Sequence, residues 1–165
     1  MPTFFRSSAP VRTVPLLAAA GVMLFCLASG PLARAADSSK MKTVTPEELA
    51  GVLNAKSSKL PKPLVLAVGP HMLYVQAHIP GSEYMGQGNT PEGQRRLSER
   101  VSKLEKKAPI VLYCGCCPWS HCPNVKPAYE ALQKMGFTNV TVLYIANNFG
   151  VDWVDKGYPV AKGEQ

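Results

Sequence analysis

A short apolar run and a helical pattern are joined, in residues 109–128, by a loop rich in cysteine; the stretch reads PIVLYCGCCPWSHCPNVKPA. Ile110–Tyr113 is apolar and β-prone and follows Pro109, which predicts a short buried strand. After the loop, apolar residues recur at three- and four-residue steps from Val125 to Met135, which predicts a helix. A thiol between a strand end and a helix start lies near free backbone N–H groups, which favour a thiolate or a bound anion. We therefore expect the chemistry of the chain in this loop.

The rest of the chain alternates predicted helices and strands. Continuous apolar runs predict further strands at residues 64–68 and 140–145. Residues 45–48, TPEE, form a capping box with proline at the first helical position, and a second helix is expected from Thr90 to about Lys107. A short helix is expected around Trp153, before Gly157. This alternation predicts an α/β domain with a mostly parallel central sheet flanked by helices.

The first 35 residues have the composition of a secretory signal peptide. Arg6 and Arg12 form a positively charged start, Leu16–Leu27 is apolar, and Ala33-Arg34-Ala35 provides small residues for cleavage near Ala35. The apolar run is too short for an ordinary membrane span, although an uncleaved anchor is the alternative. The absence of an adjacent arginine pair favours the general secretion route.

Cleavage at that point sets the expected organisation of the mature protein. Residues 36–43 are predicted to be a linker and residues 44–165 the folded domain. We expect a periplasmic or secreted protein without stable membrane insertion after cleavage.

Loss of the signal peptide also lowers the net charge from +7 to +4. The remaining basic residues include four that share one face of the second predicted helix: Arg96, Arg100, Lys103 and Lys107. Apolar residues occupy the opposite face, a pattern typical of a solvent-exposed helix surface, so we expect no nucleic-acid partner.

Five segments, in order along residues 44–160, resemble the rhodanese-like family: LVLAVGP, AHIPGSEY, IVLYC, ALQKMGFTNVTVL and DWVDKGYPV. The resemblance implies a three-layer rhodanese-like domain. It also places Cys114 where the family has the cysteine that carries sulfane sulfur as a persulfide. By this resemblance the chain is expected to be a sulfurtransferase or sulfur carrier, with a small sulfur-containing donor, a thiol or protein acceptor, and no cofactor.

The sequence departs from the family pattern near the expected site. Ala67 and Gly69 stand where the family usually has an aspartate and an arginine, and the cysteine loop is longer than usual and has no arginine. Pro118 and Pro123 remove N–H donors from the loop. We therefore expect thiosulfate to be a poor donor.

The cysteines of the loop have several possible roles around Cys114. Removal of Cys26 with the signal peptide leaves four cysteines within nine residues, which is too close to tie distant segments together. Cys114 is the expected nucleophile, and Cys116, Cys117 and Cys122 are possible resolving or anion-binding residues of the loop. Of these, Cys117 or Cys122 is expected to resolve the persulfide or to pair with Cys114 in a reversible disulfide. The adjacent pair Cys116–Cys117 is the least favourable disulfide because its ring would be strained.

Other side chains are assigned to the surroundings of Cys114. His121 or Lys126 is expected to provide a cation that lowers the pKa of the thiol or binds an anion. His71 follows a strand end, at the edge where α/β proteins bind ligands, and Trp119 is a possible pocket wall. His78 is expected to be structural.

Metal binding is the alternative function. Thiolates suit Cu(I) or Zn(II), and the possible ligands are Cys114, Cys116, Cys117, His121 and Cys122. The adjacent cysteine pair is awkward for one tetrahedral zinc, whose structural sites usually join two separated pairs. A thiol–disulfide redox module, using the C-x-x-C of Cys114 and Cys117, is the other alternative.

Overall fold

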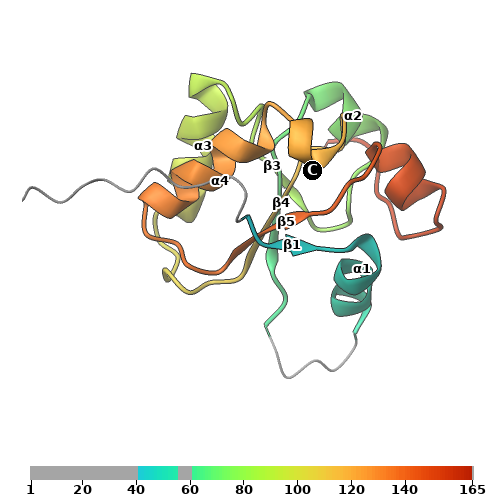
Figure 1. Ribbon diagram of the computed structural model, residues 1–165, viewed down its shortest axis with the longest axis horizontal. Coiled ribbons are helices and arrows are strands. Elements are labelled where there is room, and N and C mark those ends of the chain that lie inside the picture. The colour runs from blue at the N-terminus through green and yellow to red at the C-terminus, as the bar shows by residue number, and fades with distance from the viewer. Residues whose placement is uncertain (1–40, 56–60, 165) are drawn as a thin grey trace, which may run out of the picture. The chain divides into compact units, whose positions relative to one another are not determined.

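The computed structural model describes residues 41–55 and 61–164 (Figure 1). The predicted signal peptide and its cleavage near Ala35 lie outside the described residues. Within the described part, no helix is both long and apolar enough to cross a membrane.

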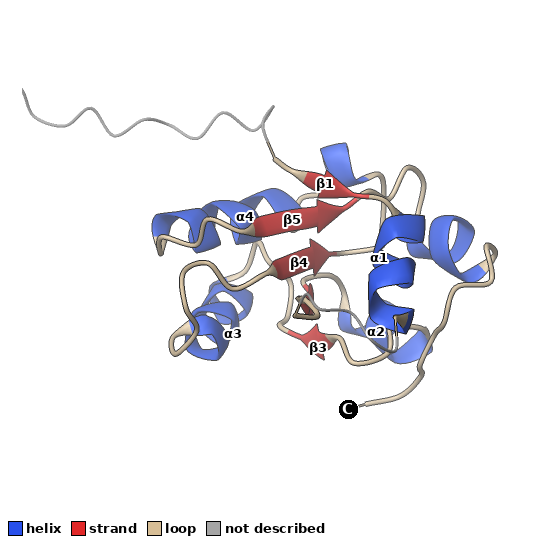
Figure 2. Cartoon of the chain, turned by 90° about the horizontal axis from the view of Figure 1, so that it is seen from below, coloured by secondary structure: helices blue, strands red, loops and turns tan. Residues whose placement is uncertain are grey.

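Five parallel strands form one sheet in the order β1-β5-β4-β2-β3 (Figure 2). The strands are β1 (Thr43–Val44), β2 (Leu64–Ala67), β3 (Glu83–Tyr84), β4 (Ile110–Tyr113) and β5 (Val140–Leu143). The central strand β4 pairs on both sides, with Leu112 opposite Leu66 of β2 and Val142 of β5. The predicted parallel sheet is confirmed.

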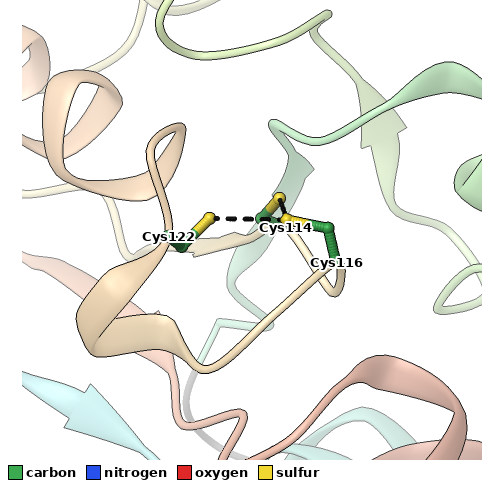
Figure 3. A group of neighbouring side chains, drawn as sticks. All are labelled: Cys114, Cys116 and Cys122. Carbon is green, nitrogen blue, oxygen red and sulfur yellow. Dashed lines mark hydrogen bonds between the residues drawn. The ribbon is translucent and has the colours of Figure 1, made fainter.

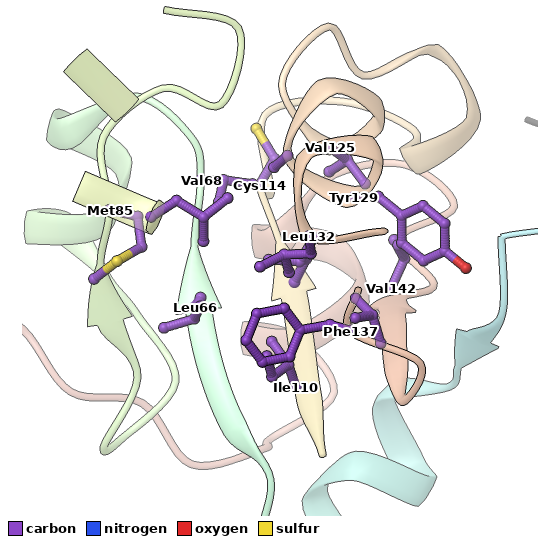
Figure 4. Close-up of a cluster of buried hydrophobic side chains, with 14 of the residues drawn as sticks. Leu66, Val68, Met85, Ile110, Cys114, Val125, Tyr129, Leu132, Phe137 and Val142 are labelled. Atoms are coloured by element: carbon purple, nitrogen blue, oxygen red, sulfur yellow. The ribbon is translucent and has the colours of Figure 1, made fainter. Parts of the chain in front are cut away.

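Helices cover both faces of this sheet and complete the three layers. The helices are α1 (Pro46–Asn54), α2 (His71–Gln76), α3 (Pro91–Val101), α4 (Val125–Lys134), the 3-10 turn η2 (Trp119–His121) and the π-helical turn η3 (Gly150–Val154). Residues of α3 and α4 pack in one core cluster, on the face shown in Figure 4. Residues of α1, α2 and η3 pack in a second cluster against the other face.

The alternation of side chains along β4 decides where Cys114 lies. Ile110 and Leu112 point into the α3–α4 cluster, whereas Val111 and Tyr113 point into the opposite cluster. Cys114 continues the first series and joins the α3–α4 cluster (Figure 4). All four strand residues are buried, and each such aliphatic side chain contributes about 1.5–3 kcal/mol to folding. The buried strand β4 therefore holds the Cys114 sulfur rigidly at the carboxyl edge of the sheet.

Several helix boundaries follow from local signals, and the capping box is confirmed. The Thr45 side chain accepts from the Glu48 N–H, while the Glu48 carboxylate accepts from the Thr45 N–H at 2.9 Å. Helix α4 ends before Gly136, which has φ +88°. Helix α3 is shorter than expected: it ends at Val101, and residues 102–107 form turns instead.

Three elements were not expected from the sequence. Thr43, assigned to the linker, begins β1 because it pairs with Val142, almost 100 residues away. Strand β3 has two residues, and α2 has six, which is too short for a periodic pattern.

Candidate functional site

The cysteine loop leaves the sheet through a tight turn. Gly115 has φ +82°, and a Cβ on it would lie 2.7 Å from the Phe149 Cβ, so the position needs glycine. The Phe149 N–H donates to the Gly115 carbonyl at 2.9 Å, and the Trp119 N–H donates to the Ile145 carbonyl at 2.8 Å. The loop is thereby fixed against the segment that follows β5.

The four thiols of the loop are free and lie close together. Figure 3 shows three of them, Cys114, Cys116 and Cys122. The Cys116 sulfur lies 3.2 Å from that of Cys114, 3.0 Å from that of Cys117 and 4.0 Å from that of Cys122. The sulfurs of Cys114, Cys116 and Cys122 all lie within 4.8 Å of one another. Cys116 is therefore the centre of the group. Among the described residues, Cys116 contacts each of the other three thiols of the loop.

The four thiols differ in how much of their surface is exposed to solvent. Cys114 and Cys122 are buried, with 7% and 5% of their surface exposed, whereas Cys116 and Cys117 are half-buried. Solvent and partner thiols therefore meet Cys116 and Cys117 more readily than the other two.

Negative charge in the cluster is favoured on Cys122. The interaction with the Cys114 thiol, followed by the N–H groups of Asn124 and Val125, lowers the pKa of Cys122 to about 5. The same interaction with Cys122, together with burial, raises the pKa of Cys114. Partial burial and a bond to Cys116 raise the pKa of Cys117 to about 12. Within this pair the negative charge is favoured at Cys122, since the N–H groups of Asn124 and Val125, near the start of α4, face that sulfur. The expected Cys114 thiolate stays a prediction.

The two expected cations have partners of their own. Lys126 pairs with Glu130 one turn along α4, and the exposed His121 ring shares a hydrogen bond with Ser120 at 3.0 Å. His121 is also absent from the group of metal-ligating atoms around Cys114, as is Cys117. No cation from either residue is thus placed beside the Cys114 sulfur.

Asn124 is a site residue that the sequence analysis missed. Its side-chain N–H donates to the Cys114 sulfur at 3.5 Å, and the residue is 2% exposed. Its Oδ1 atom is buried without a partner among the described residues. Asn124 immediately precedes α4 but makes no side-chain capping bond, and its contact is with a sulfur ten residues earlier, which no local sequence signal indicates.

A pocket opens beside the Cys114 sulfur. Its walls come mainly from apolar and aromatic residues: Gly69, Pro70, Leu73, Tyr74, Tyr84 and Phe149. None of the other three cysteines lines it. A Cβ at Gly69 would lie 2.6 Å from the Cys114 carbonyl oxygen and 2.9 Å from its sulfur. Cys114 therefore occupies the space into which a side chain at position 69 would project.

The two residues expected at the pocket lie outside its walls. His71 packs against Tyr84, with ring centres 4.9 Å apart, and its Nε2 lies 3.0 Å from Glu164. Trp119 packs against Tyr144 instead. Both remain near the site, but neither contacts the Cys114 side of the pocket.

A buried network holds the pocket floor. The Tyr113 hydroxyl lies 3.0 Å from the Ser82 hydroxyl and accepts from the Ile79 N–H at 3.3 Å. Burial raises the pKa of Tyr113, so the phenol stays protonated. His78 is fully buried, stacks on Tyr74 and bonds the Tyr74 carbonyl at 2.8 Å through Nδ1, which agrees with the structural role expected for it.

Comparison with known proteins places the chain in a family. The model of the rhodanese-like domain matches residues 45–144. The Alr3790 protein of Anabaena sp. superposes with a TM-score of 0.55 at 21% identity, covering 73% of this chain and 92% of that one. The BH2092 protein of Bacillus halodurans gives 0.53 at 19% identity, covering 73% and 77%.

A third solved structure shares the fold within a larger protein. EanB, in a structure described as a cysteine persulfide in a tetrahedral intermediate state with ergothioneine, gives a TM-score of 0.54 at 19% identity, covering 73% of this chain but 28% of EanB. No curated protein matches the chain. The match over residues 45–144, in a fold shared with these structures, shows that the chain belongs to the rhodanese-like domain family.

Proposed function

We propose that this chain is an exported sulfurtransferase or sulfur carrier that forms a persulfide on Cys114. The observation that carries the proposal is the position of the Cys114 sulfur at the end of the central strand, beside a small pocket bounded by Gly69. The persulfide recorded in EanB, which shares the fold, adds support for this chemistry.

The site provides the groups that such a transfer needs. The Cys114 sulfur attacks the sulfane sulfur of the donor, the bond between that sulfur and the rest of the donor breaks, and the remainder leaves with the electron pair. The Cys114 proton passes to the leaving group, and the Asn124 amide N–H stabilises the Cys114 sulfur as it becomes anionic. A thiol acceptor then attacks the outer sulfur and releases the Cys114 thiolate.

The pocket walls set the class of donor. Gly69 and its apolar and aromatic neighbours present no cation to a sulfonate group. A polysulfide or small persulfide loses less hydration on entering such a pocket than doubly charged thiosulfate does. We therefore expect thiosulfate to react slowly and less charged sulfane donors to react faster.

Mass spectrometry tests the proposal directly. The reduced domain is incubated briefly with a polysulfide, quenched with acid and weighed intact, and a gain of one sulfur atom on Cys114 is expected. Cys117→Ser, which changes a thiol outside the three-sulfur group, should gain the same sulfur. Unchanged protein that neither gains sulfur nor loses free thiols, or an equal gain in Cys114→Ser, contradicts the proposal.

Export is tested separately in a bacterial host. We expect the mature protein in the periplasmic or secreted fraction, with its N-terminus near Ala35. A full-length protein in the cytoplasm would contradict export without touching the sulfur chemistry.

Metal binding is a second candidate because three thiol ligands already lie together. The sulfurs of Cys114, Cys116 and Cys122 lie within 4.8 Å of one another. Ligands at about 2.3 Å from one ion lie roughly 4 Å apart, as Cys116 and Cys122 do at 4.0 Å. Three thiolates without a fourth side chain suit Cu(I) better than a tetrahedral structural zinc. Elemental analysis after anaerobic loading with Cu(I) tests it: one equivalent, lost in Cys122→Ser, favours a metal centre.

A further inference from the structure

We propose that Cys116 resolves the Cys114 persulfide by forming a Cys114–Cys116 disulfide and releasing sulfide. This inference rests on the proposed persulfide and deepens it. It gives the site a second activity, the reduction of sulfane sulfur to sulfide, in place of simple transfer to an outside acceptor.

Distance selects Cys116 among the three candidate thiols. Its sulfur lies 3.2 Å from the Cys114 sulfur, whereas Cys117 lies outside the group of mutually close sulfurs. Cys122 is buried at 5% exposure at the start of α4. Gly115 is the single residue between Cys114 and Cys116. Its left-handed backbone turns the two side chains towards each other (Figure 3).

The arrangement of the pocket selects the sulfur that is attacked. The donor reaches Cys114 through the pocket beside Gly69, so the transferred outer sulfur points into that pocket. Cys116 does not line the pocket and contacts the Cys114 sulfur from the loop. Cys116 therefore meets the inner sulfur, with the outer sulfur facing away from it as a leaving group.

The step balances without an outside reagent in its first turnover. The Cys116 thiolate attacks the inner sulfur of Cys114–S–SH, a new Cys116–Cys114 disulfide forms, and the bond to the outer sulfur breaks. The outer sulfur takes the electron pair and leaves as hydrosulfide, and the two cysteines are oxidised as the sulfane sulfur is reduced. Further turnovers require a dithiol reductant, such as a thioredoxin-type protein or dithiothreitol, to reopen the disulfide.

Exposure of the loop agrees with this need for a reductant. Cys116 is half-buried, while Cys114 is 7% exposed. An outside thiolate therefore has access to the Cys116 sulfur of the disulfide and releases Cys114 as the thiolate that begins the next cycle.

A single-turnover experiment tests the resolving step. The reduced mature domain is freed of reductant and incubated with excess thiosulfate. Sulfur transfer from thiosulfate produces no sulfide by itself, so any sulfide that appears reports resolution of the persulfide. Sulfide is trapped with monobromobimane, and the protein is weighed intact and mapped by peptide. The unchanged protein and Cys117→Ser should each release about one equivalent of sulfide and acquire a Cys114–Cys116 disulfide. Cys116→Ser should hold a stable persulfide and release none.

The outcomes separate the two proposals. A stable persulfide in the unchanged protein, or sulfide release by Cys116→Ser equal to that of the unchanged protein, overturns the resolving step and leaves the persulfide proposal intact. Because thiosulfate is expected to react slowly, Cys116→Ser is also incubated with a polysulfide, desalted and weighed intact. No added sulfur in Cys116→Ser with either donor, and no sulfide from the unchanged protein, overturns the persulfide and the resolving step together. Circular dichroism of Cys116→Ser, whose substitution removes only a half-buried thiol, confirms that the variant is folded.

Discussion

Gly69 leaves no room for a side chain beside Cys114, since a Cβ there would lie 2.6 Å from the Cys114 carbonyl oxygen and 2.9 Å from its sulfur. The carbonyl belongs to the end of the central strand and cannot move freely. We predict that Gly69→Ala lowers the free energy of unfolding by about 1–3 kcal/mol and slows persulfide formation, because the sulfur or the strand must shift.

Gly51 provides the matched control for this substitution. It lies within α1, is exposed, and a Cβ there would meet no atom within 4 Å. Gly51→Ala should raise the free energy of unfolding by about 0.5–1 kcal/mol in a urea titration and leave the sulfur chemistry unchanged. Equal stability changes in the two variants would contradict the close approach of Gly69 to Cys114.

Asn124 is predicted to assist the reaction through its bond to the Cys114 sulfur. Asn124→Ala removes an N–H that stabilises a developing sulfur anion, a contribution of about 1.5–3 kcal/mol, so persulfide formation should slow by roughly tenfold or more. Rapid-quench mass spectrometry measures the rate. The control is Asn89→Ala, which changes an exposed asparagine. A rate for Asn124→Ala equal to that of the control would show that the amide is only structural.

The cluster should contain one thiolate well below neutral pH. With a pKa of about 5, Cys122 ionises as pH rises through 5, which thiolate absorbance in the ultraviolet detects. Cys122→Ser should lose this low-pH step and Cys117→Ser should keep it. A first ionisation near the ordinary cysteine value of about 8.5 in the unchanged protein would contradict the arrangement.

The same shift links stability to pH. In the unfolded chain Cys122 binds its proton up to about pH 8.5, so between about pH 5 and 8.5 the unfolded state holds more protons than the folded one. Its contribution is complete above that window and is lost as pH falls through 5. The destabilisation caused by Cys122→Ser in urea should therefore be larger at pH 8 than at pH 5. A pH-independent difference would argue against a buried thiolate.

Tyr113 is predicted to matter for stability through its hydroxyl. Tyr113→Phe leaves the Ser82 hydroxyl and the Ile79 N–H without this buried partner, which should cost about 1–3 kcal/mol. Tyr144→Phe, at a residue 43% exposed, should change the free energy of unfolding by less than about 0.5 kcal/mol. Thermal unfolding followed by circular dichroism compares them, and equal melting temperatures for the two variants would refute the role of the network.

The fold was readable from the sequence where a signal is local. The capping box at Thr45, the strand over 110–113 and the glycine stop at Gly136 each depend on a few neighbouring residues. Strand β1 was not predicted because two residues carry no period and are defined only by pairing with β5.

The sequence predicts where the site lies but not which of its side chains contact one another. The cysteine cluster is visible as spacing, but the 3.2 Å approach of the Cys116 sulfur to the Cys114 sulfur depends on the turn at Gly115. The lowered pKa of Cys122 depends first on its contact with Cys114 and then on the N–H groups of Asn124 and Val125. These contacts depend on the three-dimensional structure and cannot be inferred from residue spacing in the sequence.

The contacts that fix the cysteine loop come from chain that is synthesised after it. Gly115 and Trp119 are held by the backbone of Phe149 and Ile145, and β4 needs β5 as its second neighbour. A nascent chain that ends before Ile145 therefore carries four thiols without the segment that orders them. The cysteines thus stop being freely available for pairing with other thiols only when Ile145 and Phe149 take their places against the loop, so folding of the C-terminal segment is a step in protecting the reactive group.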